Sequence, residues 1–244
     1  MKPTQSSRNA RIARYLLLGA AFTAVLFLVP PAAPSQDGSF TLVSPNSNPY
    51  GMTFGEWSAR WWQWAFMLPV DQGPFSWPNE SNPDCSVGQL GPVWFLVGYN
   101  PDSQGNAIKV TCHVPAGKAL FFPIVNNECS SLESDPYHGA TPEERHECAQ
   151  RDTAGATLKV KIDGQSIRNL TRYRAQSPDF DFVVPPAPNL LGFTDGAFGQ
   201  SGSDGYYLMV NLCPGRHTIE IDAGVSNSSV SFQIDTKYTI IVDR

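Results

Sequence analysis

The sequence predicts an all-β protein, an antiparallel β-sandwich or jelly roll, with an N-terminal tryptophan-rich helix and a second short surface helix. Short segments in the second half of the chain alternate between apolar and polar residues, which is the period of a half-buried strand. Proline and glycine are frequent, at 21 and 20 residues, as turn-rich β-proteins require. No strand–helix–strand rhythm and no internal repeat accompanies these strands, which argues against a parallel α/β sheet.

The first 35 residues have the pattern of a secretion signal. Four basic residues precede an apolar run over residues 15–29, two prolines break the run, and Ala33-Pro34-Ser35 offers a cleavage site. The run is short for a membrane span and no second one follows. We therefore predict a signal peptide over 1–35, with an uncleaved anchor as the alternative. Residues 36–244 are then a single secreted or periplasmic domain with no stable membrane span after cleavage.

The net charge limits the classes of partner that we expect, and the cysteines indicate the redox environment of the chain. A net charge of −5 provides no basic surface, so we do not expect nucleic acid as a partner. In an exported chain, disulfides are the expected state of cysteine. Of the several possible arrangements, we predict pairs between sequence neighbours, Cys85–Cys112 and Cys129–Cys148, and a buried thiol at Cys213.

The first helix is predicted over residues 52–69, which hold four of the six tryptophans. Thr53 and Glu56 have the spacing of a capping box, and Leu68-Pro69 ends the helix. At helical spacing, one apolar stripe collects Phe54, Trp57, Trp61, Trp64, Ala65 and Leu68.

A polar flank lies opposite this stripe and holds Glu56, Arg60, Gln63 and Met67. Glu56 and Arg60 have the favourable i,i+4 order for an ion pair. Trp62 and Phe66 lie off both faces, so we expect the helix to contact protein on two sides.

The strands are predicted in chain order, and a long proline-rich loop over residues 69–92 separates the first helix from most of them. The predicted strands cover residues 40–43, 93–97, 108–114, 119–125, 158–162, 180–182, 206–212, 217–222, 230–234 and 238–242. A glycine-rich loop is expected over 186–203. Thr141-Pro142-Glu143-Glu144 repeats the capping signature, so a short surface helix to about residue 151, held by Cys148, is expected.

Four segments of the sequence resemble a group of secreted bacterial proteins to which no activity is attached. They read GMTFGEWSARWWQW, CSVGQLGPVWFL, CHVPAGKALFFPIVNNEC and DGYYLMVNLCPGRHTI. The similarity spans roughly residues 50–242. It implies secretion and a shared C-terminal β-domain, and it carries over no catalytic residue.

No G-x-S-x-G nucleophile motif occurs, so scattered acidic residues are the first candidates for catalytic chemistry. A glycosidase needs two carboxylates about 5–10 Å apart. The candidates beside aromatic or glycine-rich segments are Glu56, Glu128, Asp195 and Asp204. Spacing in the sequence does not decide which of them converge.

A metal site and a cofactor are not expected. His146-Glu147 begins the metalloprotease motif H-E-x-x-H, but Gln150 occupies the position of the second histidine. A looser cluster of His113, His138 and His146 with Glu128 is the remaining metal candidate.

Two functional hypotheses follow. The first is a non-catalytic binding module for a glycan or another envelope component, using Arg60, Trp62, Gln63, Phe66 and Trp77, with Phe193 and Phe198 in loops. The second is an extracellular hydrolase that uses a carboxylate pair or a histidine–glutamate metal centre. A structural envelope protein is a third possibility.

Overall fold

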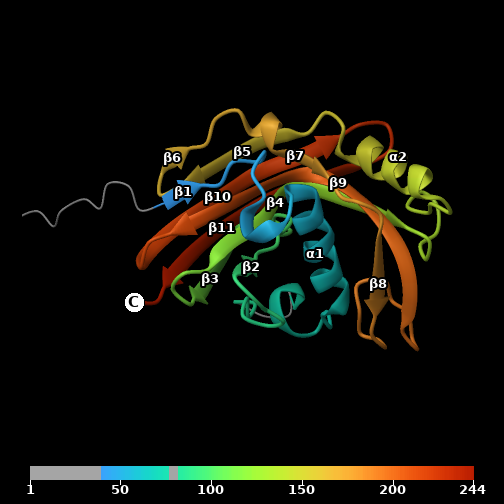
Figure 1. Ribbon diagram of the computed structural model, residues 1–244, viewed down its shortest axis with the longest axis horizontal. Coiled ribbons are helices and arrows are strands. Elements are labelled where there is room, and N and C mark those ends of the chain that lie inside the picture. Colours follow the sequence, from blue (N-terminus) through green and yellow to red (C-terminus); the bar gives the residue numbers. More distant parts are fainter. Residues whose placement is uncertain (1–39, 77–81) are drawn as a thin grey trace, which may run out of the picture. The chain divides into compact units, whose positions relative to one another are not determined.

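The computed structural model describes residues 40–76 and 82–244, which form two mixed β-sheets and two α-helices (Figure 1). The predicted signal peptide and Trp77 lie outside the described residues. The chain is mostly sheet, as predicted, but the two helices and the parallel pairings make the all-β antiparallel prediction wrong.

The first sheet is organised around one long strand. Its order is β1 (Phe40–Leu42), β9 (Ala197–Leu212), β4 (Ala119–Ser130) and β2 (Val93–Phe95). Two further strands, β7 (Arg174–Gln176) and β8 (Phe180–Val184), pair with β9 as well. β2 runs parallel to β4 and the other pairs are antiparallel. The strand β9 begins well inside the predicted glycine-rich loop, so that loop prediction is wrong for residues 197–203.

The second sheet has the order β3 (Ile108–Val114), β11 (Ser231–Val242), β10 (Gly215–Ser226), β5 (Thr157–Ile162) and β6 (Gln165–Ser166). Only β3 and β11 are parallel to each other. Asp163 and Gly164, both at positive φ, make the predicted two-residue hairpin turn between β5 and β6. Alternating side chains of β3 are buried, and they join those of the first sheet in one apolar cluster.

The tryptophan helix α1 (Phe54–Met67) has the predicted capping box between Thr53 and Glu56. It contacts protein on two sides, as predicted. Trp57, Trp61 and Trp64 belong to the main apolar cluster. On the other side, Phe66 stacks on Phe182 with 4.3 Å between ring centroids.

The helix α2 (Pro142–Thr153) also carries its predicted capping box, here between Thr141 and Glu144. The two helices lie on opposite faces of β9. Ser203 contacts Ser58 of α1, whereas the next residue, Asp204, accepts a hydrogen bond from Thr153 of α2. Successive strand residues point to opposite faces, which places one helix on each.

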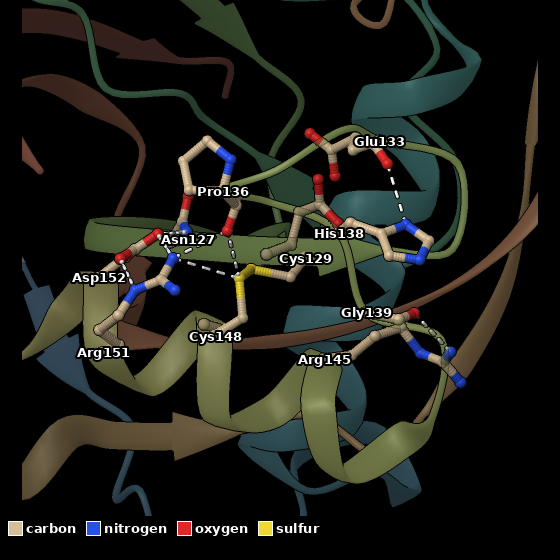
Figure 2. The surroundings of a disulfide bond; sticks show 12 residues. Asn127, Cys129, Glu133, Pro136, His138, Gly139, Arg145, Cys148, Arg151 and Asp152 are labelled. Carbon is tan, nitrogen blue, oxygen red and sulfur yellow. Dashed lines mark hydrogen bonds and ion pairs between the residues drawn. A yellow bond between two sulfur atoms is a disulfide. The ribbon is translucent and has the colours of Figure 1, made fainter. Parts of the chain in front are cut away.

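Both predicted disulfides are present, Cys85–Cys112 and Cys129–Cys148. The first ties the loop after residue 82 to β3, where the Asn82 side chain bonds the backbone of Thr111 and covers this edge strand. The second ties α2 to β4. Beside this disulfide, the Arg151 guanidinium donates a hydrogen bond to the Pro136 carbonyl at 2.9 Å (Figure 2).

Cys213 is exposed, so the prediction of a buried thiol is wrong. Leu212, the last residue of β9, takes the inward position, and Cys213 follows it in the turn to β10. The buried His217 ring holds this turn through a 2.8 Å contact between its Nε2 and the Cys213 carbonyl oxygen. Among the residues described, no helix combines the length and the apolar character that a membrane crossing needs.

Candidate ligand groove along the tryptophan helix

A groove of about 700 Å³ runs between α1 and the segment Gly88–Phe95. Trp57, Trp64 and Met67 form its wall on the helix side. Leu90 and Phe95 form the opposite wall. The volume is in the range of small-molecule sites, which are concave and mostly apolar.

The aromatic walls are held in place by their own polar atoms. The Trp57 Nε1–H donates to the Pro49 carbonyl at 2.9 Å, and the Trp64 Nε1–H donates to the Val87 carbonyl at 3.3 Å. Gly88, at φ +71°, allows the loop to approach the helix, since a Cβ there would lie 2.7 Å from the Leu68 side chain. The two indoles therefore present apolar surface to the groove.

The opposite wall is fixed by one glutamine. The Gln89 amide donates to the carbonyls of Cys85 and Phe95, at 3.0 and 2.8 Å. Its Oε1 accepts from the Phe95 N–H at 2.8 Å. With the Cys85–Cys112 disulfide beside it, this segment is a pre-formed wall rather than a free loop.

Apolar side chains at the rim are unusually exposed. Tyr50 is 49% exposed, Met67 54% and Leu90 87%. These are three of the six exposed large hydrophobic residues in the described part of the chain. Such gathering of exposed apolar groups marks an interaction site more often than scattered single residues do.

Among the residues that the structure describes, Arg60 is the only charged one that lines the groove. The predicted ion pair with Glu56 does not form, because Glu56 turns back to Thr53 and accepts from its N–H at 2.7 Å and its hydroxyl at 2.9 Å. Both hydrogen bonds lower the pKa of Glu56 below its ordinary value, and the bond from the Thr53 backbone has the larger effect. Arg60 donates instead to the Gln63 Oε1 at 3.3 Å. Within residues 40–76 and 82–244 it has no carboxylate partner.

The predicted ligand residues divide between two places. Arg60 and Gln63 line the groove. Trp62 and Phe66 lie on the other side of α1 in a small apolar cluster, where Phe66 is 1% exposed and presents no surface to a ligand. Phe193 packs against the same cluster, whereas Phe198 is exposed on β9.

The sequence analysis placed Trp57 and Trp64 on the apolar stripe of the helix and did not select Met67 or Leu90 for the site. Met67 lies on the polar flank with Arg60 and Gln63. An apolar residue on that flank was the sequence signal that could have identified it as a site residue. No sequence signal could have identified Leu90, because it reaches the groove from a separate loop.

The catalytic candidates do not converge in a cleft. Glu56 caps α1, and Asp195 is exposed in the loop before β9. Asp204 is ion-paired with Arg174 at 2.8 Å on the α2 side of the sheet. Glu128 points to the opposite side, since its neighbour Asn127 is the residue paired with Asp204.

Glu128 has a carboxyl neighbour that the sequence reasoning missed, Glu133. Glu128 is 5% exposed and accepts a hydrogen bond from the Ser201 hydroxyl. Burial raises the pKa of Glu128 well above its ordinary value, and the adjacent Glu133 carboxyl raises it further. Burial also raises the pKa of Glu133, whose carboxylate accepts from the Ser130 hydroxyl at 2.9 Å.

The metal candidates are separate from one another. His113 is exposed on β3, and the Nδ1 of His138 contacts the Glu133 carbonyl oxygen at 2.9 Å (Figure 2). His146 lies on α2, where its Nε2 is buried against Gly202. In the described residues, the one group with metal-ligand spacing is Cys129, Cys148 and Asp152, whose two sulfurs are joined in the disulfide.

Comparisons with known proteins assign no family to the chain. No family model and no curated protein matches it. Among solved structures, the solution structure of amebosin is similar over 62% of this chain and 99% of that chain, with 10% identity and a TM-score of 0.19. A likeness of this size carries no argument about function, and the resemblance to secreted bacterial proteins stays a prediction.

Proposed function

We propose that the protein is a non-catalytic binding module, secreted or periplasmic, that holds an envelope component with an apolar body in the groove along α1. In this proposal the two sheets form the predicted β-sandwich, and α1 with residues 82–95 supplies the binding surface. The observation that carries the proposal is the pre-formed, aromatic-walled groove with exposed Tyr50, Met67 and Leu90 at its rim. The two disulfides support maturation in an oxidising compartment.

An apolar ligand suits the groove better than a sugar does. A buried hydroxyl needs a hydrogen-bond partner, and a sugar ring carries several hydroxyls. In the described part of the chain, only Arg60 and Gln63 offer strongly polar side chains to the groove. The Gln63 amide already donates to the Asp181 carbonyl at 2.8 Å and accepts from Arg60. The glycan hypothesis therefore becomes the alternative outcome of the binding test.

The test places a carboxylate in the groove wall. The uncharged apolar dye N-phenylnaphthylamine should bind the protein, and Leu90→Asp should weaken that binding about tenfold because a charge disfavours apolar contact. Fluorescence titration measures the affinity. Val183→Asp is the matched control, since Val183 is 49% exposed on β8 and does not line the groove.

Equal dye affinity in the two variants, or no dye binding at all, contradicts the proposal. Binding of oligosaccharides with no dye binding favours the glycan hypothesis instead.

A hydrolase remains the second candidate, and the Glu128–Glu133 pair is the observation in its favour. A carboxyl group that stays protonated beside a second carboxyl is suited to general acid catalysis. Glu128 is nearly inaccessible, however, and Glu133 is the only partly exposed member of the pair in this conformation. Hydrolysis of a panel of chromogenic glycosides that is lost in both Glu128→Gln and Glu133→Gln supports this candidate.

The same pair predicts how stability depends on pH. The pKa of Glu128 is raised in the folded state above its unfolded value, so folding favours the protonated carboxyl. This contribution to stability is complete below the unfolded pKa and is lost as the pH rises through the folded pKa. Glu128→Gln should therefore raise the melting temperature at about pH 8 and flatten its decline from about pH 5.

Thermal denaturation across this pH range is the measurement. Glu147→Gln removes an exposed carboxylate from α2. This control variant should show the same dependence of melting temperature on pH as the parent protein. A Glu128→Gln profile that matches the parent contradicts the prediction.

A further inference from the structure

We propose that the ligand of the groove is a single-chain anionic amphiphile, whose acyl chain lies along Trp57 and Trp64 and whose carboxylate binds Arg60. This inference rests on the binding-module function and specifies its ligand class. It follows from what each part of the groove can offer to a ligand.

The long wall accepts hydrocarbon and little else. Trp57, Trp64, Leu68 and Phe95 line it, and both indole N–H groups are already used by backbone carbonyls. A polar chain entering between these rings would lose water without gaining hydrogen bonds. An alkyl chain gains from each methylene that it removes from water.

A second, smaller pocket of about 200 Å³ adjoins the groove, and Glu56, Arg60 and Gln63 are its polar side chains. Arg60 and Gln63 line both pockets, so they stand at the junction between the apolar groove and the smaller pocket. A ligand with its chain in the groove would place its head group at this junction.

The charge at the junction favours an anionic head group. Arg60 has no carboxylate partner in the described residues, because Glu56 is committed to Thr53. A guanidinium can bind a carboxylate with two parallel hydrogen bonds. Glu56 also lines the small pocket, which makes a cationic head group the competing possibility.

The shape of the groove favours a single molecule over a membrane surface. Trp57 and Trp64 are only 7% and 8% exposed, so they are recessed behind the exposed Met67 and Leu90. Rings at this depth do not reach into a bilayer interface. A chain that leaves the bilayer and enters the groove does reach them.

The experiment compares three ligands with the same chain: dodecanoate, dodecanol and dodecyltrimethylammonium. Each is titrated into the purified protein below its micelle concentration or, for dodecanol, its solubility limit, with tryptophan fluorescence and calorimetry as readouts. We expect dodecanoate to bind most tightly. Arg60→Gln should weaken dodecanoate about tenfold, the equivalent of one lost charge-assisted contact, and should leave dodecanol unchanged.

Arg168→Gln is the matched control, because Arg168 is exposed in the loop after β6 and does not line the groove. It removes the same charge and should leave all three affinities unaltered.

The outcomes separate the two proposals. Equal affinity for the three ligands, or no effect of Arg60→Gln, overturns the anionic assignment while the binding module stands. Tighter binding of dodecyltrimethylammonium than of dodecanoate overturns the anionic assignment and indicates that Glu56 binds the head group. Binding to anionic vesicles without binding to monomeric dodecanoate overturns the single-molecule assignment. If neither the dodecyl ligands nor N-phenylnaphthylamine bind, the proposed function itself fails.

Discussion

Asp179→Ala is expected to lower the free energy of unfolding by about 3–5 kcal/mol, the usual cost of leaving one member of a buried ion pair without its partner. Arg145 of α2 is 1% exposed, and its guanidinium binds both oxygens of Asp179 at 2.8 Å. Its third nitrogen donates to the carbonyls of Gly139 and Ala140, each at 3.1 Å. These two bonds persist in the variant, but the positive charge stays buried and unpaired.

Urea denaturation measures this loss, and a second ion pair provides the control. Lys159 and Asp222 approach to 2.9 Å on the outer face of the second sheet, with side chains 68% and 50% exposed. Exposed pairs contribute about 0–1 kcal/mol, so Asp222→Ala should change the free energy of unfolding little. Equal losses in the two variants would show that burial of Arg145 does not decide the cost.

Trp61→Ala is expected to cost about 3–5 kcal/mol, the range for removing a buried aromatic side chain from a core. Trp61 is 4% exposed, and its Nε1–H donates to the Leu96 carbonyl at 2.8 Å. The substitution removes the ring from the main apolar cluster and leaves that carbonyl without its donor. Because the ring joins α1 to the segment after β2, we expect the helix to lose its docking.

The neighbouring tryptophan tests this explanation. Trp61→Phe keeps most of the ring but removes the donor to Leu96, so it should cost about 1–3 kcal/mol. The buried Nε1 of Trp62 has no hydrogen-bond partner among residues 40–76 and 82–244. Trp62→Phe therefore removes an unsatisfied polar atom and should be close to neutral. Chemical denaturation of both variants measures the difference, and a Trp62→Phe loss as large as that of Trp61→Phe contradicts it.

The helices could be predicted because the information lies within a few residues, and the disulfides because each joins cysteines that are neighbours in the sequence. A threonine three positions before a glutamate can close a capping box whatever surrounds it, and this holds at both Thr53 and Thr141. Cys129 and Cys148 are only 19 residues apart, and the intervening chain brings one of them onto a helix beside the strand of the other. Neither feature depends on how the distant parts of the chain pack.

The first part of β9 could not be predicted in the same way. Its small and polar residues have low strand propensity, but here residues 197–201 pair with β8 and residues 201–205 pair with β4. Gly199 and Gly202 are required by packing, since a Cβ would lie 2.5 Å from Leu132 and 2.6 Å from His146. Tertiary contacts overrode the local preference.

The sequence by itself determined two capped helices, the cysteine pairs, the alternating strands and the polar flank that carries Arg60 and Gln63. Only the tertiary structure decided that Leu90 and Phe95 close a groove over this flank, that Glu56 leaves Arg60 without a partner, and that Glu133 lies beside Glu128. The physical reason is the range of the forces involved. Capping and strand periodicity act within a few residues of the chain, whereas a binding groove forms where surfaces far apart in the sequence are brought together by burial of the core.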